Sequence, residues 1–382
     1  MKLTSDLIYG FATSLLSERY DNPKPTPQFH RELWDYCCSD HSLVAIAAPR
    51  GHAKSTAVTH AYTLAAVLFR EADFVVLVSD TELQAVQFLN DIKMELYENQ
   101  KLRSLFKVTD IYKDAEREIR FKMGSDNHQV RIMARGASGG SGSVRGFKWR
   151  GKRPNLIICD DMENDEAVSN EERRDKFRNW FYGALIPALS DNGQIRLVGT
   201  VLHFDSLLER LMPETTGDEA QYTVKENLKE YSLDKKRAWH SIKYRAHTDF
   251  DDFQDILWPE KFNEERLTKL KNDFVRQGIS EGYAQEYLNY PIHEGDAFFR
   301  KNDFVPMSED DFDLAKVYYA AIDFAISEKD KRSYSVITVG GVDDAGILHI
   351  VDVIRQRMDA KQIIDEMMAV QIRYQPDLFV VE

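Results

Sequence analysis

A short stretch near the start of the chain combines residue types that bind phosphate. It follows the apolar run 43–46 and reads Ala47-Ala48-Pro49-Arg50-Gly51-His52-Ala53-Lys54-Ser55-Thr56. A tight loop between a strand and a helix points backbone N–H groups and the positive helix end at phosphate oxygens. In such a loop Lys54 reaches the β- and γ-phosphates of a nucleotide, and the Ser55 hydroxyl ligates Mg²⁺. The stretch therefore predicts a nucleotide site with contacts from residues 50–56.

The ends of this loop depart from the usual pattern. Phosphate-binding loops of P-loop NTPases carry Gly at both ends, whereas here those positions are Ala48 and Ala53, and Gly51 lies inside. Because Ala tolerates positive φ less well than Gly, we expect a somewhat different backbone path. The alternative interpretation is an ordinary strand-to-helix turn with a solvated Lys54.

A pair of acids at the end of a buried strand supports the nucleotide interpretation. Four apolar residues, 156–159, lead into Asp160 and Asp161. In a nucleotide-hydrolysing site the first acid holds Mg²⁺ through water, and an adjacent carboxylate orients the attacking water. Asp161 is the first candidate for that base, and Glu163 is the alternative because most such sites use Glu. A helix N-cap cluster is the competing explanation.

Two further groups of polar residues lie at predicted strand ends. The buried run 194–199 ends at Thr200, whose hydroxyl is a candidate sensor of the γ-phosphate. Later in the chain Asp323 lies in one buried strand and Glu382 ends another. Carboxylates on neighbouring strands share divalent metals that split a phosphodiester by in-line attack. Asp352, on a third strand, is interpreted as structural.

Composition limits the partners. The chain has 382 residues, a net charge of −13 and an isoelectric point near 5.4, so it does not simply coat nucleic acid. Seven basic residues and no acid occur between Arg131 and Arg153, around a Gly/Ser-rich segment. This loop suits phosphate contact, with DNA or with a neighbour's nucleotide, or it is a solvated loop. The three cysteines and the absence of a signal or membrane segment indicate a reducing, cytoplasmic setting.

The surrounding pattern predicts how these residues are positioned. Strand-like runs at 43–48, 74–79, 130–134, 156–159 and 195–198 alternate with helical patterns at about 54–70, 82–97 and 170–189. This alternation predicts an α/β fold with a parallel sheet and the phosphate loop at the carboxyl end of the first strand. A polar stretch near 213–230 marks a boundary. A second α/β pattern follows, with strands at 317–325, 335–339, 347–354 and 377–382 and a helix at 360–374.

The order of these motifs resembles the large terminase subunit of tailed bacteriophages, over essentially the whole chain. That family joins an ASCE-type P-loop ATPase with a parallel-rich sheet to an RNase H-like nuclease. The 49–55 loop resembles its variant Walker A motif, in which an Arg inside the loop is typical and the glycines vary. The resemblance implies an ATPase domain at 1–212, a linker or lid subdomain at 213–295 and an RNase H-like nuclease domain at 296–382. The sheet is unfinished at Glu382, so we expect this domain to be truncated.

The resemblance also implies residue roles. The segment 27–33 is similar to the family's adenine-recognition segment, with Gln28 the first candidate for the base contact. Val144-Arg145-Gly146 is similar to the segment carrying a trans-acting arginine finger, and Arg50 competes for that role in cis. Thr200 with His203 resembles the coupling motif. Residues 283–291 are similar to the helix that joins motor to nuclease.

Asp323 and Glu382 match the first two nuclease acids, which would bind Mg²⁺ or Mn²⁺. The third is expected beyond the last residue, so we expect weak or absent cleavage by this chain.

The function expected from these features is ATP-driven translocation of double-stranded DNA into a phage procapsid, with ATP and Mg²⁺ as cofactors. The implied partners are DNA, a portal protein, a small terminase subunit and further copies of this chain. Those copies would form a ring, which the family implies to be a pentamer. The implied location is the host bacterial cytoplasm, with no membrane involved. A helicase or repair ATPase fused to a nuclease is the first alternative. A non-catalytic nucleic-acid-binding scaffold is the second, which the intact Lys54-Ser55 and Asp160-Asp161 pairs disfavour.

Overall fold

The computed structural model describes residues 2–16, 23–137, 146–213, 223–234, 237–290, 305–308, 310–311, 314, 316–324, 335–356 and 358–381. The chain divides into two compact units, Met1–Phe298 and Phe299–Glu382. The division of the first unit predicted at residue 212 stays a prediction.

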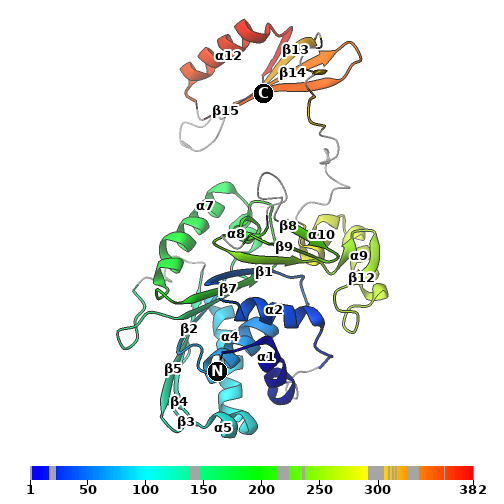
Figure 1. The fold of residues 1–382 in the computed structure, drawn as a ribbon. Coiled ribbons are helices and arrows are strands. Elements are labelled where there is room, and N and C mark those ends of the chain that lie inside the picture. The colour runs from blue at the N-terminus through cyan, green and yellow to red at the C-terminus, as the bar shows by residue number, and fades with distance from the viewer. Residues whose placement is uncertain are drawn as a thin grey trace. The chain divides into compact units, whose positions relative to one another are not determined.

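A ten-stranded sheet forms the centre of the first unit (Figure 1). Its five central pairings, β2–β5, β2–β6, β6–β7, β7–β1 and β1–β10, are parallel, and both edges are antiparallel. The predicted α/β fold with a parallel-rich sheet is therefore confirmed. In spatial order the strands are β3 (Val108–Ala115), β4 (Glu118–Met123), β5 (His128–Gly136), β2 (Phe74–Ser79), β6 (Leu156–Asp160), β7 (Gln194–Gly199), β1 (Leu43–Ala47), β10 (His240–Tyr244), β9 (Lys229–Ser232) and β8 (Thr223–Glu226).

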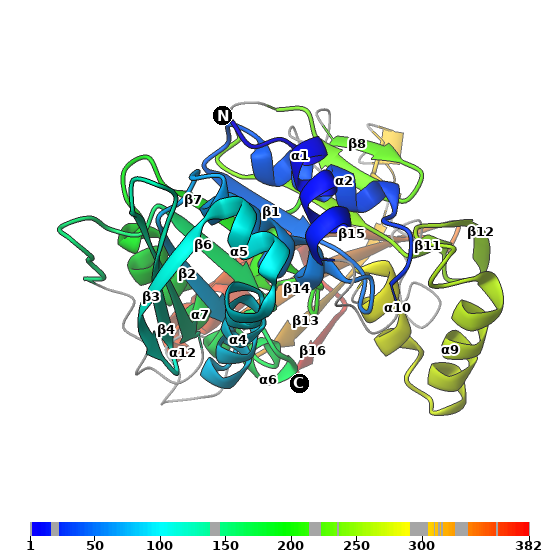
Figure 2. The same cartoon turned by 90° about the horizontal axis from the view of Figure 1, so that it is seen from below.

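Helices cover both faces of this sheet, which explains the continuous apolar runs of its central strands. Figure 2 shows one set in front of the strands. It consists of α1 (Ser5–Phe11), a π-helical turn η1 (Ala12–Leu16), α2 (Gln28–Cys38), the continuous η3 (Thr56–Tyr62) and α3 (Thr63–Leu68), α4 (Glu82–Glu98) and α5 (Gln100–Phe106). The other set consists of α6 (Asp165–Val168), α7 (Glu171–Trp180), η4 (Phe181–Leu185), η5 (Ile186–Ala188) and α8 (Leu207–Leu211). The helix predicted over 170–189 is thus α7 followed by a π turn and a 3₁₀ turn.

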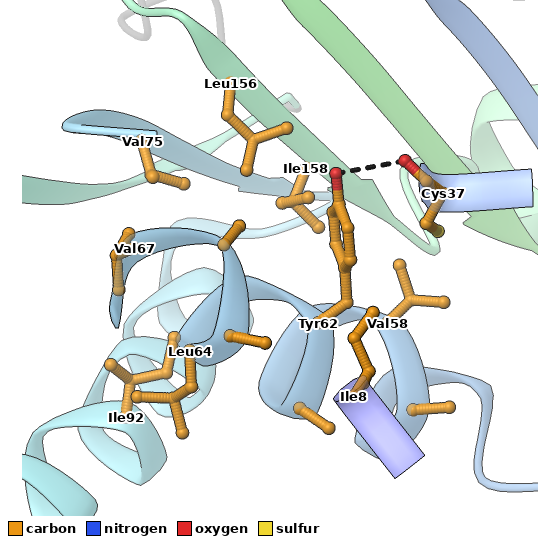
Figure 3. Close-up of a cluster of buried hydrophobic side chains, with 14 of the residues drawn as sticks. Ile8, Cys37, Val58, Tyr62, Leu64, Val67, Val75, Ile92, Leu156 and Ile158 are labelled. Carbon is orange, nitrogen blue, oxygen red and sulfur yellow. Dashed lines mark hydrogen bonds between the residues drawn. The ribbon is translucent and has the colours of Figure 1, made fainter. Parts of the chain in front are cut away.

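Alternate residues of the strands enter two separate cores. In β6, Leu156 and Ile158 pack with Tyr62 and Leu64 under the first set of helices (Figure 3), whereas Ile157 faces the second set. The Tyr62 hydroxyl crosses this core and donates to the Cys37 carbonyl at 3.1 Å. Helix η3–α3 is thereby fixed against both the sheet and the end of α2.

A buried arginine fixes the other side of the α2 end. Arg196 of β7 is fully buried and donates to the carbonyls of Cys37 at 2.8 Å, His41 at 3.0 Å and Ser42 at 3.2 Å. The Cys37 carbonyl belongs to the last turn of α2, whose final carbonyls have no partner within the helix. The carbonyls of His41 and Ser42 belong to the chain that leads into β1. The sequence pattern alone placed Arg196 only within a buried strand.

Residues 246–290 form a small helical layer on the first unit. It comprises the hairpin β11 (His247–Asp249) and β12 (Asp252–Ile256), followed by α9 (Glu264–Arg276) and α10 (Ser280–Leu288). Asn289, in the left-handed region at φ 52°, ends α10 and is fully buried. Its side chain accepts from the Val201 N–H at 2.9 Å and donates to the Tyr244 carbonyl at 2.7 Å. The end of α10 is therefore attached to the chain just after β7 and to the end of β10.

The second unit contains a four-stranded sheet in the order β15-β14-β13-β16. Strands β13 (Lys316–Asp323), β14 (Ser335–Asp343) and β15 (Leu348–Gln356) form an antiparallel meander, and β16 (Leu378–Val381) is parallel to β13. Helix α12 (Ala360–Tyr374) packs on one face through Val370, against Ala320, Ile322, Ile337 and Val339. The predicted sequence of three strands, a helix and a strand is present.

Candidate active site

The predicted phosphate loop and the acids meet at one edge of the large sheet. Strands β6, β7 and β1 are adjacent and parallel, so their carboxyl ends lie side by side. These ends deliver Asp160 and Asp161, Thr200, and the loop that begins at Ala48. Residues separated by about 150 positions in sequence are therefore brought together by the parallel topology alone.

The loop turns through two left-handed residues, Gly51 at φ 74° and Ala53 at φ 56°. A Cβ on Gly51 would lie 3.0 Å from the Phe262 ring, so only glycine fits there without displacing the ring. Ala53 adopts a positive φ in spite of its Cβ, and its carbonyl accepts from the Ala57 N–H at 2.9 Å as the helix begins. The glycine usual at this position is thus replaced by an alanine in a glycine-like conformation.

Lys54 is buried and held by two partners. Its ammonium lies 3.1 Å from the Asp161 carboxylate and donates at 3.1 Å to the Thr200 hydroxyl. That hydroxyl in turn donates to the Ala48 carbonyl at 3.3 Å. One charge is therefore positioned by all three strand ends, where the phosphate tail of a nucleotide would lie.

Asp160 has the features of a metal-binding carboxylate. It is fully buried, and one oxygen accepts from the Thr59 hydroxyl at 2.5 Å, while the other has no hydrogen-bond partner. Burial raises its pKa well above the ordinary value, as does Asp161, whereas Lys54 and the hydroxyls of Thr59 and Ser55 oppose the rise. A buried free carboxylate oxygen beside the Ser55 hydroxyl is an oxygen donor set of the kind that Mg²⁺ prefers. These residues fit the predicted ion.

The two candidates for the water-orienting acid lie in different environments. Asp161, at φ 43°, points an oxygen at Lys54. Glu163 accepts with both oxygens from the first N–H groups of α8, from Leu207 at 2.8 Å and from Leu208 at 3.0 Å. Burial raises the pKa of Glu163. Its carboxylate is engaged at the start of α8, whereas that of Asp161 faces the Lys54 ammonium.

Arg50 faces α10. Its guanidinium contacts the Glu286 carboxylate at 2.7 Å, and its backbone N–H donates to the Glu286 carbonyl at 2.8 Å. The rival arginine, Arg145, lies outside the described residues, as do most of the Gly/Ser-rich segment and Glu382. Elsewhere in the basic stretch, Arg131 is neutralised by Glu118 at 2.9 Å.

Buried aromatic residues surround the outer side of the loop. His52 stacks on Phe262 at 4.5 Å between ring centroids, and its Nδ1 donates to the Arg50 carbonyl at 3.0 Å. His30 donates through Nε2 to the His52 carbonyl at 2.8 Å. Burial lowers the pKa of His52 to about 3 and that of His30 to about 4, so both are neutral at pH 7. The sequence patterns missed Phe262 and Thr59, because each acts through a contact distant in sequence. His30 lies in the segment 27–33 that the sequence singled out, but its contact with the loop was not predicted.

A cavity of about 760 Å³ opens beside the start of η3. It is lined on one side by Ala53, Thr56 and Ala57 and on another by the segment 23–26 and His30. Gln28, the predicted base contact, is exposed at the start of α2 and is not among the lining residues. The remaining walls include Trp258, Lys261 and Arg266, which no sequence motif indicated.

In the second unit, Asp323 is exposed at the end of β13, and the register with β16 runs as far as Ile322 opposite Val381. Asp352 accepts from the Tyr374 hydroxyl at 2.9 Å, in keeping with its structural interpretation. Across the described part of the chain, no three His, Cys, Asp or Glu side chains gather as a metal site, and no helix is long and apolar enough to cross a membrane.

Comparison with known proteins points to one group of solved structures. No protein-family model and no curated protein matches the sequence. The chain is similar to the large terminase of the thermophilic bacteriophage D6E in complex with ADP, at 11% identity over 94% of this chain and 77% of that one, with a TM-score of 0.43. It is similar to the large terminase ATPase domain of Thermus phage P74-26, at 14% identity over 70% and 94%, with a TM-score of 0.44. It is also similar to the Phi-28 gp11 DNA packaging motor, at 12% identity over 90% and 91%, with a TM-score of 0.37.

These are proteins of the kind that the motif order resembles.

Proposed function

We propose that this chain is an ATPase of a DNA-packaging motor and that it hydrolyses ATP at the carboxyl edge of the large sheet. The observation that carries the proposal is the position of Lys54, within 3.1 Å of both Asp161 and Thr200 at the end of a phosphate loop. Within the part of the chain that the structure describes, the Lys54 ammonium contacts Asp161 and Thr200, both of which have a role in the proposed ATPase site.

Each residue then has a defined task. The N–H groups at the start of η3 and the Lys54 ammonium bind phosphate oxygens. Ser55 and the free oxygen of Asp160 would hold Mg²⁺, which neutralises charge on the transferring phosphate. Asp161 orients the attacking water, because its carboxylate lies at the phosphate end, whereas Glu163 is committed to α8. Thr200, already bonded to Lys54, moves when that ammonium turns to a phosphate.

We further propose that hydrolysis drives double-stranded DNA into a phage procapsid. The supporting observations are the motif order and the basic stretch between Arg131 and Arg153. On this proposal the partners are DNA, a portal protein, a small terminase subunit and further copies in a ring, one of which would receive Arg145. The second unit, with Asp323 and Glu382, is proposed as a metal-dependent nuclease domain.

The test is ATP turnover with and without linear double-stranded DNA, for the wild type and Lys54→Ala. We expect turnover that DNA stimulates and that the variant lacks. Lys269→Ala is a matched control, because it removes a lysine exposed on α9 and away from the loop. Turnover by Lys54→Ala equal to the wild type would refute the site. DNA strand separation coupled to hydrolysis would favour the helicase alternative.

A further inference from the structure

The cavity beside η3 has one wall from a part of the chain that carries no recognised nucleotide motif. Trp258 and Lys261 come from the segment between β12 and α9, and Arg266 comes from the first turn of α9. They face residues of the phosphate loop and its helix across a cavity of about 760 Å³. Volumes of several hundred cubic ångströms are typical of small-molecule sites. The cavity touches Ala53 and Thr56 but not Asp160 or Asp161, so it continues the phosphate site away from the acids.

The two cations on this wall lack carboxylate partners within the described residues. The Lys261 ammonium lies over the Trp258 ring at 4.9 Å, and Arg266 lies over Phe262 at 4.7 Å and donates to the Lys261 carbonyl at 3.0 Å. Burial lowers the pKa of Lys261, and Arg266 lowers it further. Two neighbouring cations, one of them partly desolvated, are unfavourable unless an electron-rich ligand offsets their repulsion.

We propose that Lys261 and Arg266 bind the nucleoside end of the nucleotide, so that ATP bridges the phosphate loop and the 257–276 segment. Both side chains only donate hydrogen bonds, and the base and ribose of a purine nucleotide supply acceptors and a π face. This inference rests on the proposed function, because it takes the phosphate end of the same ligand to lie at Lys54.

A direct contact already links this wall to the loop. Phe262, next to Lys261, stacks on His52 and closes over Gly51. A ligand in the cavity would therefore lie beside a residue that contacts the loop itself. On this proposal, the position of α9 depends on whether the site holds a whole nucleotide or only a phosphate chain.

The experiment is calorimetric titration of the full chain with Mg·ADP and, separately, with inorganic tripolyphosphate. We expect Lys261→Ala and Arg266→Ala each to weaken ADP binding about tenfold, the loss of one charged hydrogen bond. Tripolyphosphate, which lacks a nucleoside, should bind both variants as it binds the wild type. Lys269→Ala on the same helix should change neither affinity, and Lys261→Arg should restore most of the lost ADP affinity.

The outcomes separate this inference from the proposed function. Unchanged ADP binding in both variants overturns the inference while leaving the ATPase site intact. Equal losses for ADP and tripolyphosphate also overturn it, since the cations would then act on phosphate. If the wild type binds no ADP, or if Lys54→Ala binds it equally well, the proposed nucleotide site itself fails, and the inference with it.

Discussion

Replacement of Asn289 by alanine tests how the helical layer 246–290 is attached to the sheet. The Asn289 amide joins two backbone groups that have no connection in sequence, the Val201 N–H and the Tyr244 carbonyl. Asn289, Val201 and Tyr244 are all buried. Truncation leaves one donor and one acceptor without partners and without access to water.

The magnitude follows from this count. A buried polar group left unpaired costs about 1–3 kcal/mol, so the two groups together predict a loss of about 2–6 kcal/mol. Alanine also tolerates the left-handed backbone less well than asparagine, which adds about 1 kcal/mol. Asn127→Ala isolates that second contribution, since Asn127 has a similar φ of 55° in an exposed turn. The difference between the two variants should be about 3 kcal/mol.

The assay is equilibrium unfolding in urea followed by tryptophan fluorescence. All five tryptophans lie within Met1–Phe298, so the signal reports on the first unit alone. Asn289→Gly, in which the backbone strain is absent, should remain almost as unstable as Asn289→Ala. A difference below about 1 kcal/mol between Asn289→Ala and Asn127→Ala would show that these two hydrogen bonds do not hold the layer in place.

Three further predictions use the same protein. His30 and His52 are neutral in the folded protein, whereas in the unfolded chain both protonate as the pH falls below their ordinary pKa. Between pH 7 and 5.5 the free energy of unfolding should therefore fall by about 2–3 kcal/mol more than in a variant with glutamine at both positions. An equal dependence of unfolding free energy on pH in the two proteins would contradict this. Arg196→Met should lower the free energy of unfolding by about 3 kcal/mol, because the carbonyls of Cys37 and His41 each lose the hydrogen bond from a buried guanidinium. An unchanged urea midpoint would refute that role. Glu286→Gln should alter the free energy of unfolding by less than about 1 kcal/mol, because the Arg50 side chain is mostly exposed. The same variant should raise ATP turnover if Arg50 is the arginine finger of its own subunit. A lower turnover would argue that the Arg50–Glu286 ion pair itself supports the loop.

The sequence predicted the phosphate edge because its geometry depends on short patterns. A buried run ending in Asp160 and another ending in Thr200 must meet once the strands are parallel, whatever lies between them. The sequence already placed Asp161 before Glu163 as the candidate base, and that order stays a prediction. What the sequence could not show is that the Glu163 carboxylate accepts from the first N–H groups of α8. Arg145 and Glu382 stay predictions.

The contacts that hold the loop from outside were beyond sequence reasoning. Phe262 and Glu286 lie more than 200 positions from the residues they contact, in segments whose pattern indicates only amphipathic helix and turn. An asparagine at the position of Asn289 is typical of a helix end. The sequence around it does not show whether its amide bonds to the helix itself or, as here, to groups that follow two different strands. Strands β3, β8 and β9 were missed because partly exposed strands carry weak periodicity. Strands β4 and β10 are mostly buried, but they are only six and five residues long.

The last turn of α10 and its cap residue make three separate attachments around the carboxyl edge of the sheet. Glu286 holds Arg50 through both its side chain and its carbonyl, the Tyr287 carbonyl accepts from the Ala246 N–H at 2.8 Å, and Asn289 ties the chain after β7 to the end of β10. Packed elements joined in this way shift between discrete arrangements and do not deform continuously. A change in the loop at Arg50 must therefore either break the Glu286 contact or move the last turn of α10 with it. Thr200, the proposed γ-phosphate sensor, follows β7, and Asn289 binds the next residue, Val201. On the proposed function, a change in the bound nucleotide would therefore reach this turn both through Arg50 and through Thr200. Disulfide cross-linking of α10 to the loop should then slow ATP turnover while leaving ADP binding intact, and equal turnover in the oxidised and reduced forms would show that the two move independently.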